Sequence, residues 1–493
     1  LLAAGVGLVT AFIAAALPAA RAARTGIAST VRLRGQEHPG RREGTPWLLI
    51  RFGVLLAVAV CLVLQSIFPS AVWGICATLW LAIAMPLFAQ PFVRLASPPL
   101  LRLFRRVGPT AFLAMKNVAE SPRRTALTIG MIGVGVGAVL WLWAVAHSFE
   151  LSVVDSVSQY MRSELTVTSS HVAAGFLEAP VTGQLLDEVR HVPGVASASA
   201  MRVQDWPYSG GNITLEVYDP DYFTSSDFGH LPLIARGPDD LWRRVSRGEA
   251  LVISSSFQKN LGGQIGEYIT LDTPHGALTL PIAGVASLFV SARGTVVFSR
   301  DLYRRYWDDE LVTRVFVHTP TETIASTRAA IERDLGKKYV LRILSSHEIV
   351  DYFALQVQRG FAGLHIITIV IMCVVLVGMG DTLTAGIIER VREIGAIRVV
   401  GVRRGSVRRM VLLEAIIVGS LGIVLAIVTG AALGTLWIEA TFPALLGYVL
   451  LPYTPYFNGL VLVVATMIVC LLAASIPARR AAHLEPATAL RYE

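Results

Sequence analysis

Long apolar runs with few or no charges are the dominant pattern along this 493-residue chain. A helix that crosses the ~30 Å hydrocarbon core of a bilayer needs about 20 such residues. Seven segments meet this requirement, at residues 1–20, 46–68, 71–93, 125–146, 361–380, 415–438 and 457–476. The sequence therefore predicts a membrane protein with an α-helical transmembrane bundle, seven spans of which lie in this chain.

Residues 148–360 have a different pattern, in which short alternating stretches are separated by turn residues. Alternation of apolar and polar residues is typical of half-buried strands. We expect strands at 164–168, 251–254, 268–271, 279–282 and 315–318, helices at 185–192 and 323–335, a hairpin turn at 273–276, and loops at 205–212 and 219–240. The segment is therefore predicted to be one large mixed α/β domain, which holds together without disulfides because it contains no cysteine.

The positive charges are concentrated in the short segments between spans. Residues 21–51, 94–124, 381–414 and 477–493 together hold 24 Arg and Lys residues against 9 Asp and Glu residues. Basic loops remain on the cytosolic side, so we place these segments and the C-terminus in the cytosol and the large domain outside. The resulting units are a cytosolic linker at 21–45, a two-span hairpin at 46–93, a cytosolic or interfacial segment at 94–124, a span at 125–147, the outside domain at 148–360 and a three-span core at 361–493.

Composition and charge exclude several classes of protein. Hydrophobic residues make up 54% of the chain and charged residues 16%, whereas a typical soluble domain has about 25% charged residues. The net charge of +8 is expected to face anionic lipid head groups and a cytosolic partner rather than nucleic acid. The sequence contains no P-loop, His-Glu-x-x-His or Gly-x-Ser-x-Gly motif, so we predict no catalytic, cofactor-binding or metal-binding residues in this chain.

The two ends of the chain resemble each other. Residues 14–32 align without gaps on residues 473–491 with nine of nineteen positions identical, and Pro18 coincides with Pro477. Such a repeat indicates a duplicated architecture. We expect residues 1–20 to be the last span of a truncated preceding repeat, and the chain to be the C-terminal part of a longer protein.

The cytosolic segment 386–405 combines an apolar stripe with many charges. Ile387, Val391, Ile394 and Ile397 recur at helical spacing. The other candidate residues in this segment are Glu389, Arg390, Arg392, Glu393, Gly395, Arg398 and Gly401. Gly401 and Gly405 are expected to end the helix and turn the chain back. The segment is either an interfacial helix without a partner or a surface that a cytosolic protein binds, and we favour the second interpretation.

Two further spans carry glycines four residues apart. Gly133 and Gly137 lie in the span that begins at 125, and Gly430 and Gly434 lie in the span that begins at 415. Small residues at this spacing let two helices approach closely. We expect these glycines to pack helices together inside the protein.

Taken together, these segments resemble the FtsX-like permease family of ABC transporters, the group that includes MacB and the lipoprotein-releasing LolC and LolE proteins. The resemblance lies in Arg392-Glu-Ile-Gly-Ala-Ile-Arg-Val-Val-Gly401, in Glu414 and the glycines after it, in Pro477-Ala-Arg-Arg-Ala-Ala, and in Asn117 with the Ser-Pro-Arg-Arg-Thr that follows. It covers residues 110–493. The hairpin at 46–93 is similar to that of ten-span members, in which two such units are fused, although this chain lacks most of the first unit.

The resemblance implies a multi-pass permease subunit of the bacterial cytoplasmic (inner) membrane. A separate pair of cytosolic ATPase subunits would use ATP and Mg²⁺, and this chain would bind no cofactor. The ATPase would move the coupling loop at 386–405, with the apolar stripe in its groove and Glu393 and Arg398 paired at the rim. The spans would transmit this motion to a MacB-like outside domain, and so export or extract a lipid, lipoprotein or peptide-like substrate. The alternative is a signal transmitter that controls an extracellular cell-wall hydrolase partner.

The charge distribution makes a prediction about topology. In a cysteine-free background, cysteines introduced at Ser226 and Thr273 should react with a membrane-impermeant reagent on intact cells, because both lie in the segment placed outside. A cysteine at Gly405 should react only after the membrane is opened. Labelling of the Gly405 position alone on intact cells would overturn the topology.

Overall fold

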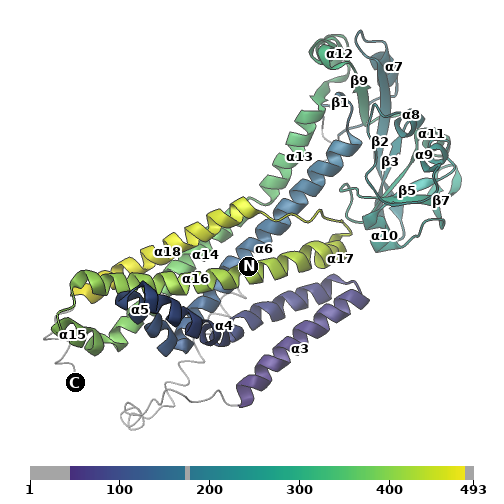
Figure 1. Ribbon diagram of the computed structural model, residues 1–493. Helices are drawn as coiled ribbons and strands as arrows, with labels where there is room; N and C mark the ends of the chain where they lie inside the picture. Colours follow the sequence, from purple (N-terminus) through teal and green to yellow (C-terminus); the bar gives the residue numbers. More distant parts are fainter. Residues whose placement is uncertain (1–44, 172–177, 484–493) are drawn as a thin grey trace. The chain divides into compact units, whose positions relative to one another are not determined.

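The computed structural model describes residues 45–171 and 178–483 (Figure 1). Within these residues, six helical segments are long and apolar enough to cross a membrane. They comprise α3 (Thr45–Ile67), α4 (Ala71–Val107), α6 (Pro122–Tyr160), α13 (Ser346–Gly360) with α14 (Gly363–Glu389), α16 (Arg404–Leu436) with its continuation, and α18 (Tyr456–His483). They coincide with six of the predicted spans. The seventh prediction, at 1–20, and the linker before Thr45 lie outside the described residues.

Helix α6 is much longer than a membrane span. Its 39 residues correspond to roughly 58 Å, about twice the thickness of the hydrocarbon core. The outer part of α6 therefore continues beyond the bilayer, where it packs beside α13. Gln358 on α13 donates a hydrogen bond to the carboxylate of Glu150 on α6 at 2.7 Å.

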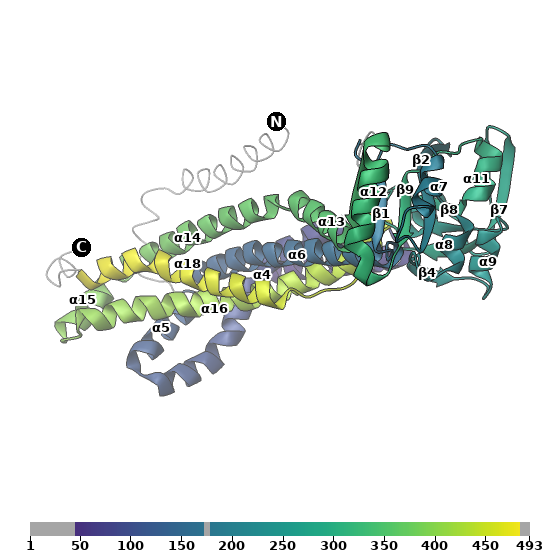
Figure 2. The same ribbon diagram turned by 90° about the horizontal axis from the view of Figure 1, so that it is seen from above.

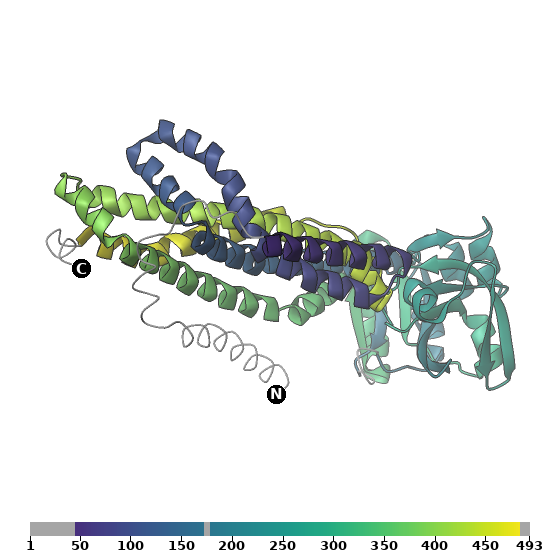
Figure 3. The same cartoon turned by 90° about the horizontal axis from the view of Figure 1, so that it is seen from below.

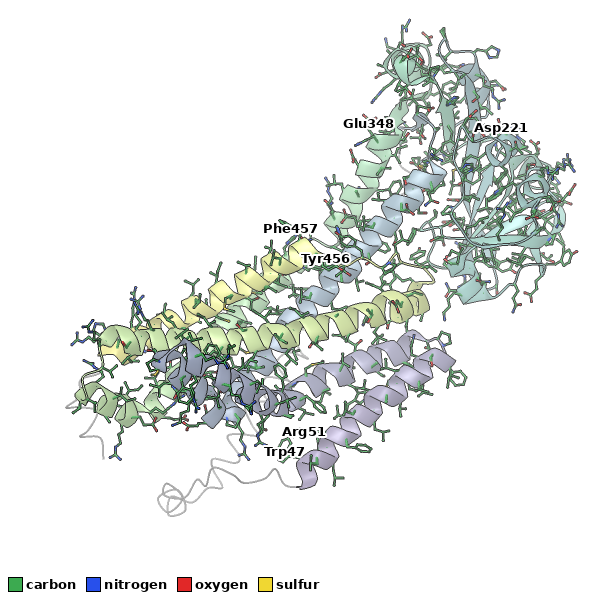
Figure 4. The ribbon with its side chains drawn as sticks, in the orientation of Figure 1. Trp47, Arg51, Asp221, Glu348, Tyr456 and Phe457 are labelled. Atoms are coloured by element: carbon green, nitrogen blue, oxygen red, sulfur yellow. The ribbon has the colours of Figure 1, made fainter. Side chains whose placement is uncertain are left out.

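The start of α13 is fixed by a capping box. Ser345 accepts a hydrogen bond from the backbone of Glu348, and the Glu348 side chain accepts one from the backbone of Ser345. Arg328 forms an ion pair with Glu348 at 3.0 Å. Figure 4 labels Glu348 on α13. Helices α6 and α13 thus connect the outside domain to the spans as two ordered segments.

The outside domain contains a mixed sheet. Among the described residues, ten strands follow the order β10-β1-β9-β2-β3-β8-β5-β7-β4, and β6 pairs with β7. The strands are β1 (Leu165–Ser169), β2 (Ser197–Tyr208), β3 (Gly211–Tyr218), β4 (Leu233–Arg236), β5 (Leu251–Ser254), β6 (Tyr268–Thr273), β7 (Gly276–Ala286), β8 (Thr295–Ser299), β9 (Arg314–His318) and β10 (Leu341–Ser345). The β3–β8 and β5–β7 pairs are parallel and the other pairs antiparallel, which makes this the mixed α/β domain expected from the sequence.

Short helices cover the sheet (Figure 2). They are α7 (Gln184–Arg190), α8 (Pro220–Thr224), α9 (Leu241–Ser246), α10 (Ser255–Leu261), α11 (Arg300–Trp307) and α12 (Ile324–Tyr339). Leu185 of α7 and Ile331 of α12 share one apolar cluster with β1 and β9. Phe257 of α10 and Tyr303 of α11 share a second with β3, β5 and β8. The domain thus has its own core, separate from that of the spans.

Two of the predicted loops are wrong. The segment 205–212 is a hairpin between β2 and β3, whose two-residue turn, Ser209 and Gly210, has positive φ at both positions (47° and 76°), as type I′ turns require. The segment 219–240 contains α8 and the edge strand β4. Pro220 is compatible with α8 because it occupies the first helical turn.

Helices α6 and α16 pack against each other more extensively than any other described pair. A Cβ atom at Gly133 would lie 2.8 Å from Leu425, and one at Gly137 would lie 2.8 Å from Thr429. On the opposite helix, a Cβ at Gly430 would lie 2.7 Å from Leu140. These glycines allow the two backbones to approach closely inside the protein.

The outer end of α16 widens into a π-helical segment, η2 (Trp437–Thr441), before α17 (Phe442–Leu446). Here the helix contacts the α3–α4 hairpin. The Trp437 indole donates a hydrogen bond to Thr78 at 2.8 Å, and Thr441 fills the space over Gly74. Helix α4 is thereby joined to the end of α16.

The glycine contacts differ in how much space they leave. A Cβ at Gly434 would lie 3.7 Å from the nearest atom, which is ordinary van der Waals contact, whereas Gly430 leaves no such space. We therefore expect Gly430→Ala to lower the thermal unfolding midpoint of the detergent-solubilised chain by several degrees, and Gly434→Ala to have little effect. Equal midpoints for the two variants would contradict the close packing described for Gly430.

Candidate coupling site

The segment between α14 and α16 forms a compact turn, which we call the coupling turn. Helix α14 ends at Glu389, Arg390 is non-helical (φ −112°, ψ 21°), and α15 (Val391–Val399) begins directly after it. Gly401 then takes a positive φ of 101°, which lets the chain turn into α16 at Arg404. Gly405 lies inside the first turn of α16, so the expectation that it helps to end the preceding helix was wrong.

Two ion pairs join this turn to neighbouring helices. Arg124, near the start of α6, lies 2.6 Å from the carboxylate of Glu389. Arg390 lies 3.2 Å from the carboxylate of Glu414 on α16. Glu414 is only 8% exposed, so Arg390 compensates a buried charge that would otherwise be costly. Gly386 leaves the space that the Arg124 guanidinium occupies. The turn is therefore fastened to both α6 and α16.

The apolar stripe faces the protein itself. Ile394 is 5% exposed and lies in a cluster with Val407 and Val411 of α16 and with Ala478 and Ala481 of α18. Ile387 packs against the same cluster, Gly395 is buried, and Val391 and Ile397 are half-buried. This corrects the expectation that the stripe docks in the groove of a partner. The break at Arg390 and the neighbouring helices α16 and α18 explain the difference, because they provide an apolar surface within the chain.

Other side chains of the turn point away from the protein. Arg392 and Glu393 are exposed. So are Ile388 (67%), Val399 (60%) and Val400 (85%), which our sequence reasoning did not single out. Arg398 instead donates a hydrogen bond to the backbone oxygen of Ala482 at 3.1 Å. The exposed surface, which we call the outer face of α15, consists of Ile388, Arg392, Glu393, Val399 and Val400. The aliphatic residues at 399–402 were the sequence signal for this exposed surface.

The far end of α6 is embedded in the outside domain. Tyr160, its last residue, is 4% exposed, and its backbone oxygen accepts a hydrogen bond from the Tyr222 hydroxyl at 2.8 Å. Tyr160, Tyr218, Tyr222 and Phe316 share one apolar cluster. The end of the helix is thus part of the core of the domain.

A buried charge cluster surrounds the same helix end. Arg314 on β9 forms a bidentate ion pair with Glu178, with distances of 2.8 to 3.2 Å. Burial raises the pKa of Glu216 on β3 to about 7, although the Arg314 charge and a hydrogen bond from Tyr218 oppose the shift. Buried groups of this kind are satisfied only in one arrangement. They hold the strands around α6 in a fixed register.

Three buried serines on α6 bond to backbone groups of distant segments. Ser148 accepts a hydrogen bond from Tyr453 N at 3.2 Å, and Ser152 accepts one from Leu451 N at 2.8 Å. Ser156 donates to the backbone oxygen of Ser287, after β7, at 2.9 Å. These residues recur every fourth position and so lie on one side of the helix. This serine ladder connects α6 to the loop before α18 and to the outside domain.

An aromatic cluster surrounds the serine ladder. The Phe289 ring centroid lies 5.8 Å from that of Phe149 on α6 and 4.9 Å from that of Tyr448 in the loop before α18. Phe442 of α17 lies 5.6 Å from Phe149. Ring pairs at such distances contribute beyond the area they bury. The domain, α6 and the end of α16 therefore meet in one packed junction.

Two protein families match this chain, one over its last membrane spans and one over its outside domain. Residues 365–486 match the FtsX-like permease C-terminal family, and residues 125–334 match the MacB-like periplasmic core domain. The last three spans are therefore similar to those of FtsX-like permeases. The outside domain, with the span before it, is similar to the MacB-like periplasmic core domain.

Proteins similar to this chain are named as ABC transporter permeases or as MacB proteins. An uncharacterized ABC transporter permease protein of Mycobacterium tuberculosis is 25% identical over 99% of this chain and 57% of its own length. A macrolide export ATP-binding/permease protein MacB of Bordetella avium is 25% identical over 81% of this chain and 62% of its own length. The chain thus spans about three fifths of the length of these relatives.

One solved structure is similar to part of this chain. The periplasmic region of MacB from Actinobacillus actinomycetemcomitans is 10% identical and covers 41% of this chain and 96% of that chain, with a TM-score of 0.30.

In residues 45–171 and 178–483, no group of three His, Cys, Asp or Glu side chains is arranged to hold a metal ion. The buried charges described above pair with one another. Helix α6 therefore connects the turn between α14 and α16, at one of its ends, to the outside domain at the other.

The serine ladder can be tested with a matched control on the same helix. The double variant Ser152→Ala, Ser156→Ala should destabilise the full chain by about 1–3 kcal/mol, because it leaves backbone groups without partners. Ser158→Ala should have almost no effect, because Ser158 is exposed and bonds only within its own helix. Thermal unfolding in detergent would measure both. The same midpoint in the double variant and in wild type would show that the ladder does not fasten the junction.

Proposed function

We propose that this permease transmits an ATP-driven conformational change from a separate pair of cytosolic ATPase subunits to its outside domain. The movement then exports or extracts a lipid, lipoprotein or peptide-like substrate on the outer side. The spans act as force-transmitting elements, and the substrate need not pass between them. ATP and Mg²⁺ bind to the partner ATPase.

The observation that carries the proposal is the continuity of α6. One helix runs from Arg124, which is paired with Glu389 in the coupling turn, to Tyr160 in the core of the outside domain. Helix α6 contains no proline after Pro122. Through this unbroken segment, a movement of the coupling turn would displace the outside domain.

The outer face of α15 is the surface that we assign to the ATPase. Val399 and Val400 supply apolar contacts, with Arg392 and Glu393 beside them. Burying one aliphatic side chain contributes roughly 1.5–3 kcal/mol, whereas an exposed ion pair contributes less than about 1 kcal/mol. Arg398 and the apolar stripe support this face from behind, because they hold α15 on α16 and α18.

The nature of the substrate follows only by analogy. Three of the similar proteins are named as macrolide export proteins, so a macrolide joins the lipid, lipoprotein and peptide classes as a candidate. Purifying the intact complex with its bound cargo would separate these classes. Recovery of a cell-wall hydrolase in place of cargo would favour the signalling alternative.

A pair of substitutions tests the assignment of the ATPase surface. Val400→Asp should reduce recruitment of the ATPase subunits to membranes at least about tenfold, because it places a charge where an apolar group is buried in the complex. The variant should fold normally, since Val400 is exposed in the chain itself. Ile394→Asp should instead lower expression and thermal stability, because Ile394 is buried within the protein.

The control is Ile234→Asp, which introduces the same charge at an exposed position (47%) of the outside domain. It should leave recruitment unchanged. If Val400→Asp recruits the ATPase and supports transport-linked ATP turnover as well as Ile234→Asp does, the outer face of α15 is not the coupling surface.

A further inference from the structure

Helix α4 is too long to lie entirely within the bilayer. Its 37 residues correspond to roughly 55 Å, whereas the hydrocarbon core is about 30 Å thick. The apolar span ends at Val93, and Arg94, Arg102, Arg105 and Arg106 follow. Prolines at 86, 91, 98 and 99 lie inside the helix and allow it to bend. The last four turns therefore leave the hydrocarbon core.

The tail of α4 and helix α5 (Pro109–Glu120) form a curved segment that projects beside the helical bundle (Figure 3). We call residues 94–120 the α4–α5 arch. On its inner side, Ala114, Met115 and Val118 are fully buried in the core of the spans. Arg105 lies 5.4 Å from the ring centroid of Phe112, which ties the two limbs together. The arch is thus an ordered part of the bundle, with one side covered.

The outer side of the α4 tail is exposed and has two neighbouring strips. One is apolar and consists of Leu103 and Val107, which are 55% and 68% exposed. The other is basic and comprises the exposed residues Arg102, Arg105 and Arg106. On a helix of 100° per residue, these three arginines lie within about 100° of one another, on one side of Leu103 and Val107. An exposed apolar strip beside a row of arginines is the pattern of a helix that lies in a membrane interface.

The charge of the arch identifies the lipid. Residues 94–120 contain five basic residues and one acidic residue, Glu120. Next to a membrane surface, each Arg or Lys is attracted to anionic lipid. Because α5 leads directly into α6 at Pro122, the arch lies at the level where α6 enters the membrane. Its outer side therefore faces the head groups of the same leaflet.

We propose that the α4–α5 arch is a binding surface for anionic phospholipid head groups. Leu103 and Val107 insert below the head groups, and Arg102, Arg105 and Arg106 contact the phosphates. Helix α5 packs on α16 and on α6. Anionic lipid thus fixes the arch against α6 and α16, the two helices to which the coupling turn is fastened by ion pairs. This role does not require the ATPase.

The test uses the full chain in lipid nanodiscs. In a variant with its four native cysteines replaced, Leu103→Cys carries a bimane fluorophore, and acrylamide measures its exposure to water. Nanodiscs of phosphatidylcholine alone are compared with nanodiscs that also contain phosphatidylglycerol. We expect acrylamide quenching to fall by about twofold when the anionic lipid is present. The triple variant Arg102→Gln, Arg105→Gln, Arg106→Gln should lose this difference.

The control is the triple variant Arg243→Gln, Arg244→Gln, Arg247→Gln, which removes the same charge from the outside domain. It should retain the lipid dependence, and unfolding midpoints would verify that all variants are folded. Equal quenching in the two lipids would overturn the proposal, as would protection that survives loss of the three arginines. Protection that arises only when the ATPase subunits are added would assign the arch to a protein partner instead. None of these outcomes depends on whether the outer face of α15 binds the ATPase.

Discussion

The unbroken hydrogen-bonded backbone of α6 is the constraint on which the rest of this structure depends. Inside a bilayer, a helix cannot open its backbone without losing hydrogen bonds that lipid does not replace. One rigid element therefore satisfies three separate sets of contacts. These are the ion pair of Arg124, the close approach at Gly133 and Gly137, and the serine ladder with Tyr160 in the domain core.

Helix α16 is the second element of this arrangement. It holds the coupling turn through Glu414, accepts α6 at Gly430, and reaches the α3–α4 hairpin through its π-helical end. The loop that follows it returns to Ser148 and Ser152 of α6. The two helices are therefore joined at the inner end, in the middle and at the outer end. A movement of either one alone would break contacts at all three levels.

Much of this fold could be predicted from local sequence patterns. The spans follow from the length of the apolar runs, and strands such as β5 and β9 follow from short apolar runs bounded by turn residues. The β2–β3 hairpin was missed because Asp205 and Pro207 look like loop residues, although both lie in a strand that ends in a two-residue turn. Composition is a weaker guide here than the turn geometry at Ser209 and Gly210.

The contacts of the candidate site were harder to predict, because they join residues far apart in the sequence. The period of Ile387, Val391, Ile394 and Ile397 correctly indicates one apolar side, but it does not reveal what covers that side. In a membrane protein, such an apolar side can be covered either by the chain itself or by a partner. Likewise, nothing near Ser152 in the sequence indicates Leu451, its hydrogen-bond donor 299 residues away.

The serine ladder and the glycines of α6 also limit how the length of this helix can change. Between Gly137 and Ser148, one inserted residue would rotate everything beyond it by about 100° and advance it by about 1.5 Å. The serines would then face away from the backbone groups that they satisfy. An insertion of seven residues would nearly restore the angle while moving the outside domain about 10 Å farther from the membrane. Changes in the length of this helix during evolution should therefore occur close to whole double turns, so that the reach of the domain varies in steps.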